Sequence, residues 1–202
     1  FGVPTGTMAE VIAKAQAMTT RPVVLSDSGD NPTGGGTGDR ADALAELLRL
    51  KVRDAVLAGI ADRPATEACY AAGVGKTITL KVGGSLDPQA SKPVEIAAKV
   101  VFLAKTDRLP ERQAVIQVEG VTVVLTARRR PFHEIVDFTS LGLDPTASKI
   151  VVVKAGYLVP PIAAIANPNL MALSDGAVNQ DIPRLANRHR VPTYPWVGDL
   201  HY

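Results

Sequence analysis

The sequence predicts an α/β fold in which a parallel sheet with flanking helices is interrupted by an antiparallel β section at about 76–127. Short apolar, β-branched runs at 22–26, 55–58 and 149–154 alternate with helical patterns, which is typical of buried parallel strands in βα units. Residues 76–82 (K-T-I-T-L-K-V) instead alternate polar and apolar side chains strictly, as a half-buried antiparallel strand does. The continuous apolar runs and the alternating segment together indicate a mixed sheet.

Helices are predicted where a capping residue precedes periodic apolar positions. Thr7 and Glu10 match a capping box that begins a helix over 7–17. The next helix, which follows a glycine-rich loop, has Asp39 or Thr37 as its predicted N-cap. Further helices are expected at about 40–50, 64–72, 132–141, 161–166 and 182–187, further strands at 94–104, 114–119, 121–126 and 170–173, and an extended tail at 191–196.

Composition and charge narrow the class of protein. The chain has 202 residues, which favours a single α/β domain over 1–202, with 22 basic and 20 acidic residues and a net charge of +2. This balance gives no basic stripe for nucleic acid. The longest apolar runs, such as 150–153 and 162–166, are far shorter than the roughly 20 residues that span a bilayer. No signal segment opens the chain, so we expect a cytoplasmic protein without membrane contact. The chain begins at Phe1, so we expect a processed chain or a fragment.

The densest polar segment is D-S-G-D-N-P-T-G-G-G-T-G-D at 27–39, between a predicted strand and a predicted helix. Consecutive glycines allow backbone N–H groups to approach a ligand, and the loop lies where parallel strands present ligand sites. The segment therefore predicts a site for a carboxylate, phosphate or oxyanion. A flexible turn capped by Asp39 is the alternative. The candidate residues are Asp27, Asp30, Asn31, Gly34, Gly35, Gly36 and Asp39.

Two basic positions extend this candidate site. The run Arg128–Arg130 follows a predicted strand, and alternation places Arg129 on the face opposite its two neighbours. It is either a solvated charge run, or one arginine pairs with a ligand carboxylate. Lys154 follows a buried strand at the carboxyl edge of the sheet, where a role toward ligand competes with ordinary strand-end polarity.

Other reactive residues give no separate site. The segment 73–77 (G-V-G-K-T) lacks the first glycine of a P-loop and precedes a strand rather than a helix. No two of His133, His189 and His201 have a metal-ligand spacing, so no metal ligand is assigned in this chain. Cys69 lies mid-helix among alanines and is expected to be a small buried residue.

Several segments, in this order, resemble the carboxyl-terminal domain of the MlrC family of microcystinase C-like zinc metallopeptidases of bacteria. They are D-S-G-D-N-P-T-G-G-G-T-G-D at 27–39, A-G-V-G at 72–75, T-I-T-L-K-V-G-G at 77–84, V-V-L-T-A-R-R at 123–129, K-I-V-V-V-K at 149–154 and the proline-rich end T-Y-P-W. The resemblance covers nearly the whole chain, and the D-N-P-x-G-G-G segment is its most specific part.

The resemblance implies a two-domain hydrolase that acts on linear peptides or small amides. Its zinc ligands belong to an amino-terminal catalytic domain absent from this sequence, so none is carried over here. The glycine loop, Arg129 and Lys154 match recurring positions of the second domain, whereas Tyr157 follows a departure from the family pattern. The expected partners are the chain's own amino-terminal domain and a small peptide or amide substrate.

Two hypotheses follow for the function of this chain. In the first, the chain is the second domain of a metallohydrolase, inactive alone, whose glycine loop closes over the metal-bearing domain and holds the substrate carboxylate or the oxyanion. In the second, it is a non-catalytic module that binds a small anion or forms a homo-oligomer through the strands at 76–127.

Overall fold

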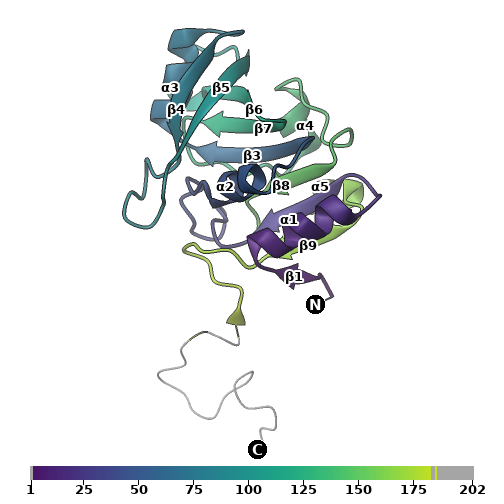
Figure 1. The fold of residues 1–202 in the computed structure, drawn as a ribbon. Helices are drawn as coiled ribbons and strands as arrows, with labels where there is room; N and C mark the ends of the chain where they lie inside the picture. The colour runs from purple at the N-terminus through teal and green to yellow at the C-terminus, as the bar shows by residue number, and fades with distance from the viewer. Residues whose placement is uncertain (1, 183–184, 186–202) are drawn as a thin grey trace, which may run out of the picture.

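The computed structural model describes residues 2–182 and 185, and its centre is one mixed sheet of nine strands in the order β1-β9-β2-β8-β3-β7-β6-β5-β4 (Figure 1). The strands are β1 (Thr5–Gly6), β2 (Val23–Asp27), β3 (Ala55–Ala61), β4 (Thr77–Val82), β5 (Val94–Leu103), β6 (Gln113–Val118), β7 (Val121–Thr126), β8 (Ile150–Val153) and β9 (Asn169–Ala172). All pairs from β1 to β7 in this order are parallel, and the pairs β7–β6, β6–β5 and β5–β4 are antiparallel. The predicted fold class and the antiparallel section are confirmed.

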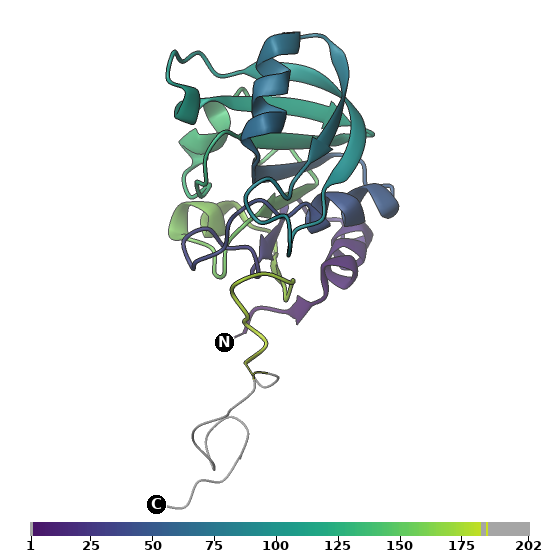
Figure 2. The ribbon, with the colours of Figure 1, turned by 90° about the vertical axis from the view of Figure 1, so that its left-hand side faces the viewer.

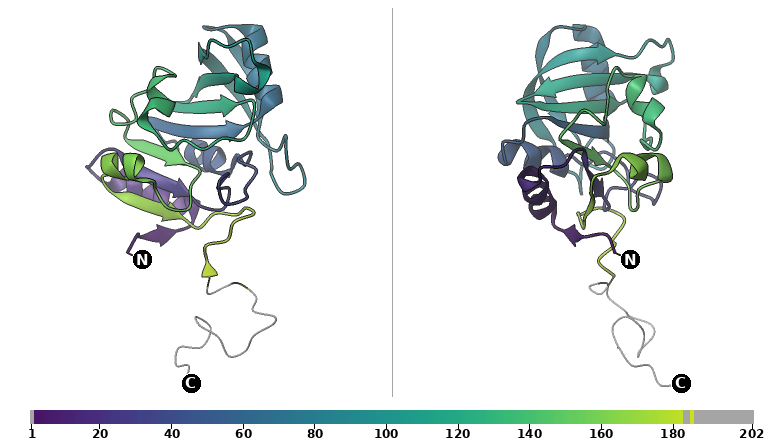
Figure 3. Two further views of the ribbon diagram at one scale, coloured as in Figure 1. Left: turned by 180° about the vertical axis from the view of Figure 1, so that it is seen from behind. Right: turned by 90° about the vertical axis from the view of Figure 1, so that its right-hand side faces the viewer.

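Helices cover both faces of the sheet. They are α1 (Met8–Ala17), α2 (Asp42–Arg49), α3 (Arg63–Ala72), α4 (Ile135–Thr139) and α5 (Pro160–Ile165), with a short 3-10 turn at Leu109–Glu111. Helices α1, α2 and α3 pack on one face, and α4 and α5 lie behind it on the other (Figures 1 and 3). Each face therefore has its own apolar cluster, with Leu25 and Leu57 in the first and Val24 and Val151 in the second.

Local sequence explains why these elements form. The Thr7–Glu10 capping box at the start of α1 is present as predicted. Asp62 caps α3 through the backbone N–H of Ala65, one residue earlier than the prediction from Pro64, and Gly73 ends that helix. In β4 the side chains alternate between exposed and buried, because one face of this section is open to solvent.

Several predicted boundaries are wrong. The N-cap of α2 is Ala41, without a side-chain hydrogen bond, so neither Asp39 nor Thr37 caps it. Helix α4 is five residues long instead of spanning 132–141, because Phe132 lies buried in a non-helical segment that enters the core. The two-residue β1 was not predicted, and the helix at 182–187 and the extended tail at 191–196 lie largely or wholly outside the described residues.

The carboxyl ends of β2, β3, β7 and β8 share one edge of the sheet, because these strands are mutually parallel. Figure 2 views this side, where the loops at 28–40 and 83–93 and the segment at 173–182 gather. The predicted site residues therefore meet at the carboxyl edge of the sheet.

Among the described residues, no helix is long and apolar enough to cross a membrane.

Candidate functional site

Asp30 joins the two ends of the glycine loop. Its Oδ1 accepts a hydrogen bond from the backbone N–H of Gly38 at 2.8 Å, and its Oδ2 accepts one from the backbone N–H of Arg40 at 2.8 Å. The Asp30 side chain is 2% exposed. A carboxylate that receives backbone N–H groups in this way closes the loop into one fixed unit, as capping side chains do for helices.

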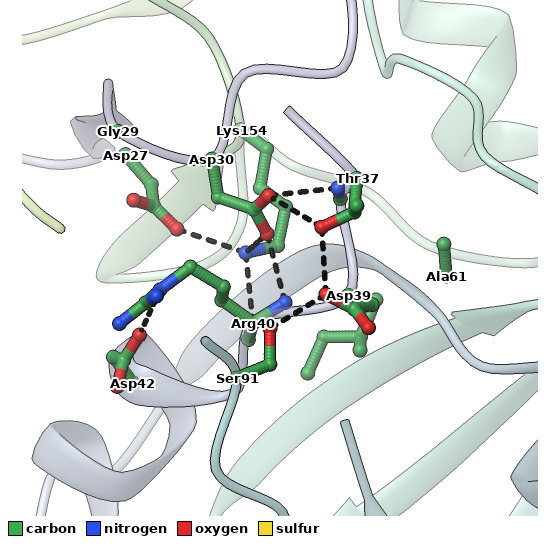
Figure 4. A network of polar contacts seen from close by, with 12 residues as sticks. Asp27, Gly29, Asp30, Thr37, Asp39, Arg40, Asp42, Ala61, Ser91 and Lys154 are labelled. Atoms are coloured by element: carbon green, nitrogen blue, oxygen red, sulfur yellow. Dashed lines mark hydrogen bonds and ion pairs between the residues drawn. The ribbon is translucent and has the colours of Figure 1, made fainter. Parts of the chain in front are cut away.

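Lys154 binds the same carboxylate, and Figure 4 shows its ammonium group among Asp27, Asp30 and Arg40. Its Nζ lies 3.0 Å from Asp27 Oδ2 and 2.9 Å from Asp30 Oδ2, and it donates to the carbonyl of Arg40 at 2.9 Å. Burial alone would lower the pKa of Lys154, but the two carboxylates outweigh it and raise that pKa. All three ammonium donors are thus engaged within the protein, and Lys154 holds the loop from inside.

Asp27 is tied to a segment far along the chain. Its Oδ1 accepts a hydrogen bond from Ser174 Oγ, which in turn accepts one from the backbone N–H of Gly29 at 2.9 Å. We call residues 174–178 the strap. Val178 N–H donates to the carbonyl of Gly29 at 3.0 Å, so the strap is bonded to the start of the glycine loop at both of its ends.

Close contact with the strap explains the glycine at position 29. A Cβ added there would lie 2.1 Å from the carbonyl oxygen of Ser174, which is backbone and cannot turn away. The strap was not predicted as part of the site. One signal was available: it follows β9, so it begins at the same carboxyl edge as the glycine loop.

Asp39 links the glycine loop to the loop between β4 and β5. Its carboxylate accepts hydrogen bonds from the backbone N–H groups of Leu86 and Asp87, both at 2.8 Å, and from the hydroxyls of Thr37 and Ser91, both at 2.7 Å. Burial alone would raise the pKa of Asp39, but these four donors lower it. The Asp39 charge is therefore held by the protein itself.

The tip of the loop, at residues 34–36, is built on Asn31. The backbone N–H groups of Gly34 and Gly36 both donate to the carbonyl of Asn31, and the Asn31 side chain accepts from Thr33. A Cβ on Gly36 would lie 2.7 Å from the backbone of Asp30. At Gly35, by contrast, nothing lies within 4 Å of an added Cβ, and φ is +110°. Gly35 thus forms the open, outward-facing part of the loop.

The three consecutive arginines have separate partners. Arg129 is exposed, and its Nη1 donates to the carbonyl of Gly36 at 3.3 Å, so its guanidinium lies beside the loop tip. Arg128 pairs with Glu111 at 3.1 Å and Arg130 with Asp137 at 2.7 Å. Strand β7 ends at Thr126, so strand alternation does not decide these directions.

Metal-binding and nucleophilic groups are sparse in the described part of the chain. There, no three His, Cys, Asp or Glu side chains lie together in a way that could hold a metal ion. His189 and His201 lie outside the described residues. Cys69 is fully buried, and burial together with the charge of Asp62 raises the pKa of its thiol to about 11. A thiol with this pKa is a poor nucleophile at neutral pH.

The chain matches known proteins in sequence and in overall fold. The model of the family described as MlrC C-terminus matches residues 25–189, and the chain belongs to this family. The match begins in β2 and includes the glycine loop, Arg129, Lys154 and the strap.

Two relatives carry further information. Microcystinase C from Sphingomonas sp. is 31% identical over 147 residues, which are 73% of this chain and 26% of that protein. The crystal structure of a proposed metallopeptidase from Mesorhizobium sp. BNC1 superposes with a TM-score of 0.77 at 20% identity. The superposition covers 100% of this chain and 42% of the Mesorhizobium protein, so this chain spans less than half the length of either relative.

Proposed function

We propose that this chain is the second domain of a metallohydrolase that cleaves linear peptides or small amides. In this proposal the tip of the glycine loop and Arg129 bind the carboxylate of the substrate or the oxyanion formed from it. Its family and its likeness to a proposed metallopeptidase support the role in a metallohydrolase. The catalytic metal, which we expect to be zinc, and its ligands would lie in an amino-terminal domain, consistent with the greater length of the relatives.

One observation carries the assignment of the loop tip. Gly35 is exposed, with open space over its Cα, and the exposed guanidinium of Arg129 lies against Gly36. A guanidinium has five N–H donors in a planar fork that matches a carboxylate, and one of them is used here by the Gly36 carbonyl. Asp27, Asp30, Asp39 and Lys154 would act indirectly, because their polar atoms bind one another and the loop backbone.

The test is a bulky residue at the loop tip of the full-length protein. Gly35→Trp adds its side chain in open space, at the cost of backbone strain at φ +110°, so the control variant must carry a similar strain. Turnover of a linear peptide should fall by about tenfold or more, because substrate can no longer approach the backbone. Gly75→Trp is the matched control, since Gly75 also has positive φ (+89°) and nothing within 4 Å of an added Cβ. Equal turnover in the two variants, with equal thermal stability, would contradict the proposal.

A further inference from the structure

Arg129 is held against the glycine loop at two points along its side chain. Its Nη1 donates to the carbonyl of Gly36 at 3.3 Å, and its Cγ lies 3.8 Å from the position of a Cβ added to Gly38. The aliphatic stem therefore packs on the loop, while the residue as a whole remains exposed. This placement fixes a guanidinium beside the loop tip.

The positive charge of Arg129 is not balanced by a carboxylate. Arg128 and Arg130, its two neighbours, each form an ion pair with an acidic side chain. In the described part of the chain, Arg129 belongs to none of the ion pairs. Residues 31–37, which form the part of the loop beside it, carry no charged side chain. An anionic ligand would therefore supply the charge that this surface lacks.

Backbone N–H groups of the loop are used within the loop itself. Those of Gly34 and Gly36 donate to the carbonyl of Asn31. That of Gly38 donates to the carboxylate of Asp30. The loop therefore offers a ligand space rather than a cradle of these donors, and the attraction for an anion comes from the neighbouring guanidinium.

These features fit a carboxylate better than an oxyanion. An oxyanion hole consists of fixed donors in a site closed to water. Arg129 is exposed and is joined to the loop by one hydrogen bond, and its other N–H donors form a planar fork that matches a carboxylate. The open space over Gly35 also allows main chain to come close. A carboxylate at the end of a peptide is attached directly to main chain, whereas a side-chain carboxylate is not.

We propose that Arg129 and the loop tip bind the terminal α-carboxylate of a peptide, so that the full-length protein acts on peptides with a free carboxyl end. The proposal rests on the proposed hydrolase function and narrows it. It assigns a carboxylate rather than the oxyanion to this site, and it makes Arg129 the residue that selects the substrate. Peptides that end in a carboxamide should be poor substrates.

Binding of small probes to the full-length protein tests the site without turnover. The probes are N-acetylalanine, its carboxamide, and N-acetylisoglutamine, whose one carboxylate is on the side chain, and ligand-observed NMR measures their affinities. N-acetylalanine should bind saturably, and each of the other two about tenfold more weakly. Arg129→Gln should reduce the affinity for N-acetylalanine to that for its carboxamide. Arg128→Gln is the matched control and should not change this affinity, because Arg128 is exposed but pairs with Glu111.

Turnover separates this proposal from the hydrolase function. One pool of N-acetylated linear peptides is prepared with free carboxyl ends and again as carboxamides, and mass spectrometry follows cleavage by the full-length protein. The free pool should be cleaved about tenfold faster, and Arg129→Gln should remove this preference.

Each contrary result has one meaning. Cleavage of neither pool would contradict the hydrolase function. Equal cleavage of both pools, or equal binding of N-acetylalanine and its carboxamide, would overturn the carboxylate site alone. Equal binding of N-acetylalanine and N-acetylisoglutamine would overturn the assignment to the end of the peptide.

Discussion

A single ammonium group, that of Lys154, lies between two carboxylates from which water is excluded. The side chains of Lys154, Asp27 and Asp30 are 2%, 5% and 2% exposed. The sequence places all three at the carboxyl edge but does not show that they bind one another, because Lys154 and Asp27 lie 127 positions apart. A lysine directly after a strand predicts where that residue lies in the fold. It does not predict which groups the lysine side chain binds, because those groups are brought to it by the fold from distant parts of the sequence.

Removal of the Lys154 charge should therefore destabilise the domain strongly. Lys154→Met leaves two buried carboxylates without a cation, and breaking a buried ion pair in this way costs about 3–5 kcal/mol. Chemical denaturation of wild type and variant measures the difference. Lys99→Met, at an exposed position of β5, should change the free energy of unfolding by less than about 0.5 kcal/mol. A small, equal effect at both positions would show that the buried cluster contributes nothing specific.

At the scale of elements, predictions succeeded where the cause is local. The capping box of α1 involves residues three positions apart, and its outcome agrees with the pattern. The cap of α2 was mispredicted because Asp39 has better partners 47 to 52 positions away, in the loop between β4 and β5. Similarly, the strap bonds to residues about 145 positions before it, which no local pattern could indicate.

The contact between strap and glycine loop gives an element-scale prediction. Gly29→Ala should displace the strap, because the new Cβ would meet the Ser174 carbonyl, and such overpacking costs about 1–3 kcal/mol. Hydrogen exchange at the Val178 N–H, which donates to Gly29, should become faster. Gly2→Ala is the control, since nothing lies within 4 Å of its added Cβ. Unchanged protection of Val178 in Gly29→Ala would contradict this account.

At the scale of the whole molecule, Asp39 joins the parallel layer to the antiparallel section. Fold class and strand textures were predictable, since burial on one or both faces shapes each strand's own sequence. Strand order was not, because β8 separates β2 from β3, and which runs become neighbours depends on packing across the sheet. The Asp39 carboxylate crosses this division with its hydrogen bonds to Leu86, Asp87 and Ser91.

The lowered pKa of Asp39 predicts how stability depends on pH. A carboxylate with a lower pKa in the folded state stabilises the protein above its unfolded pKa of about 3.9, and that contribution is lost as the pH falls through the folded value. Asp39→Asn should cost about 2–3 kcal/mol near neutral pH, and the difference from wild type should shrink below about pH 4. Urea unfolding of wild type and Asp39→Asn, near neutral pH and below about pH 4, measures this difference in the free energy of unfolding.

Asp62 provides a control of opposite sign. Burial raises its pKa, so its ionisation disfavours the folded state, and its contribution to stability improves as the pH falls through the folded pKa. Asp62→Asn should therefore remove a contribution to the free energy of unfolding that increases as the pH falls. Asp39→Asn should remove a contribution that decreases as the pH falls. The same pH trend in both variants would show that net charge, rather than these two environments, sets the acid response.

The central position of β8 also determines the order in which the strands can pair during synthesis of the chain. Strands β3 to β7 come from one continuous stretch, 55–126, and can pair as soon as that stretch emerges. Strand β2 is made earlier, yet both of its neighbours, β8 and β9, are synthesised more than a hundred residues later. During translation β2 therefore has no partner strand on either edge until residues 150–172 are synthesised. Pairing of β8 and β9 then joins β2 to the part of the sheet formed by residues 55–126.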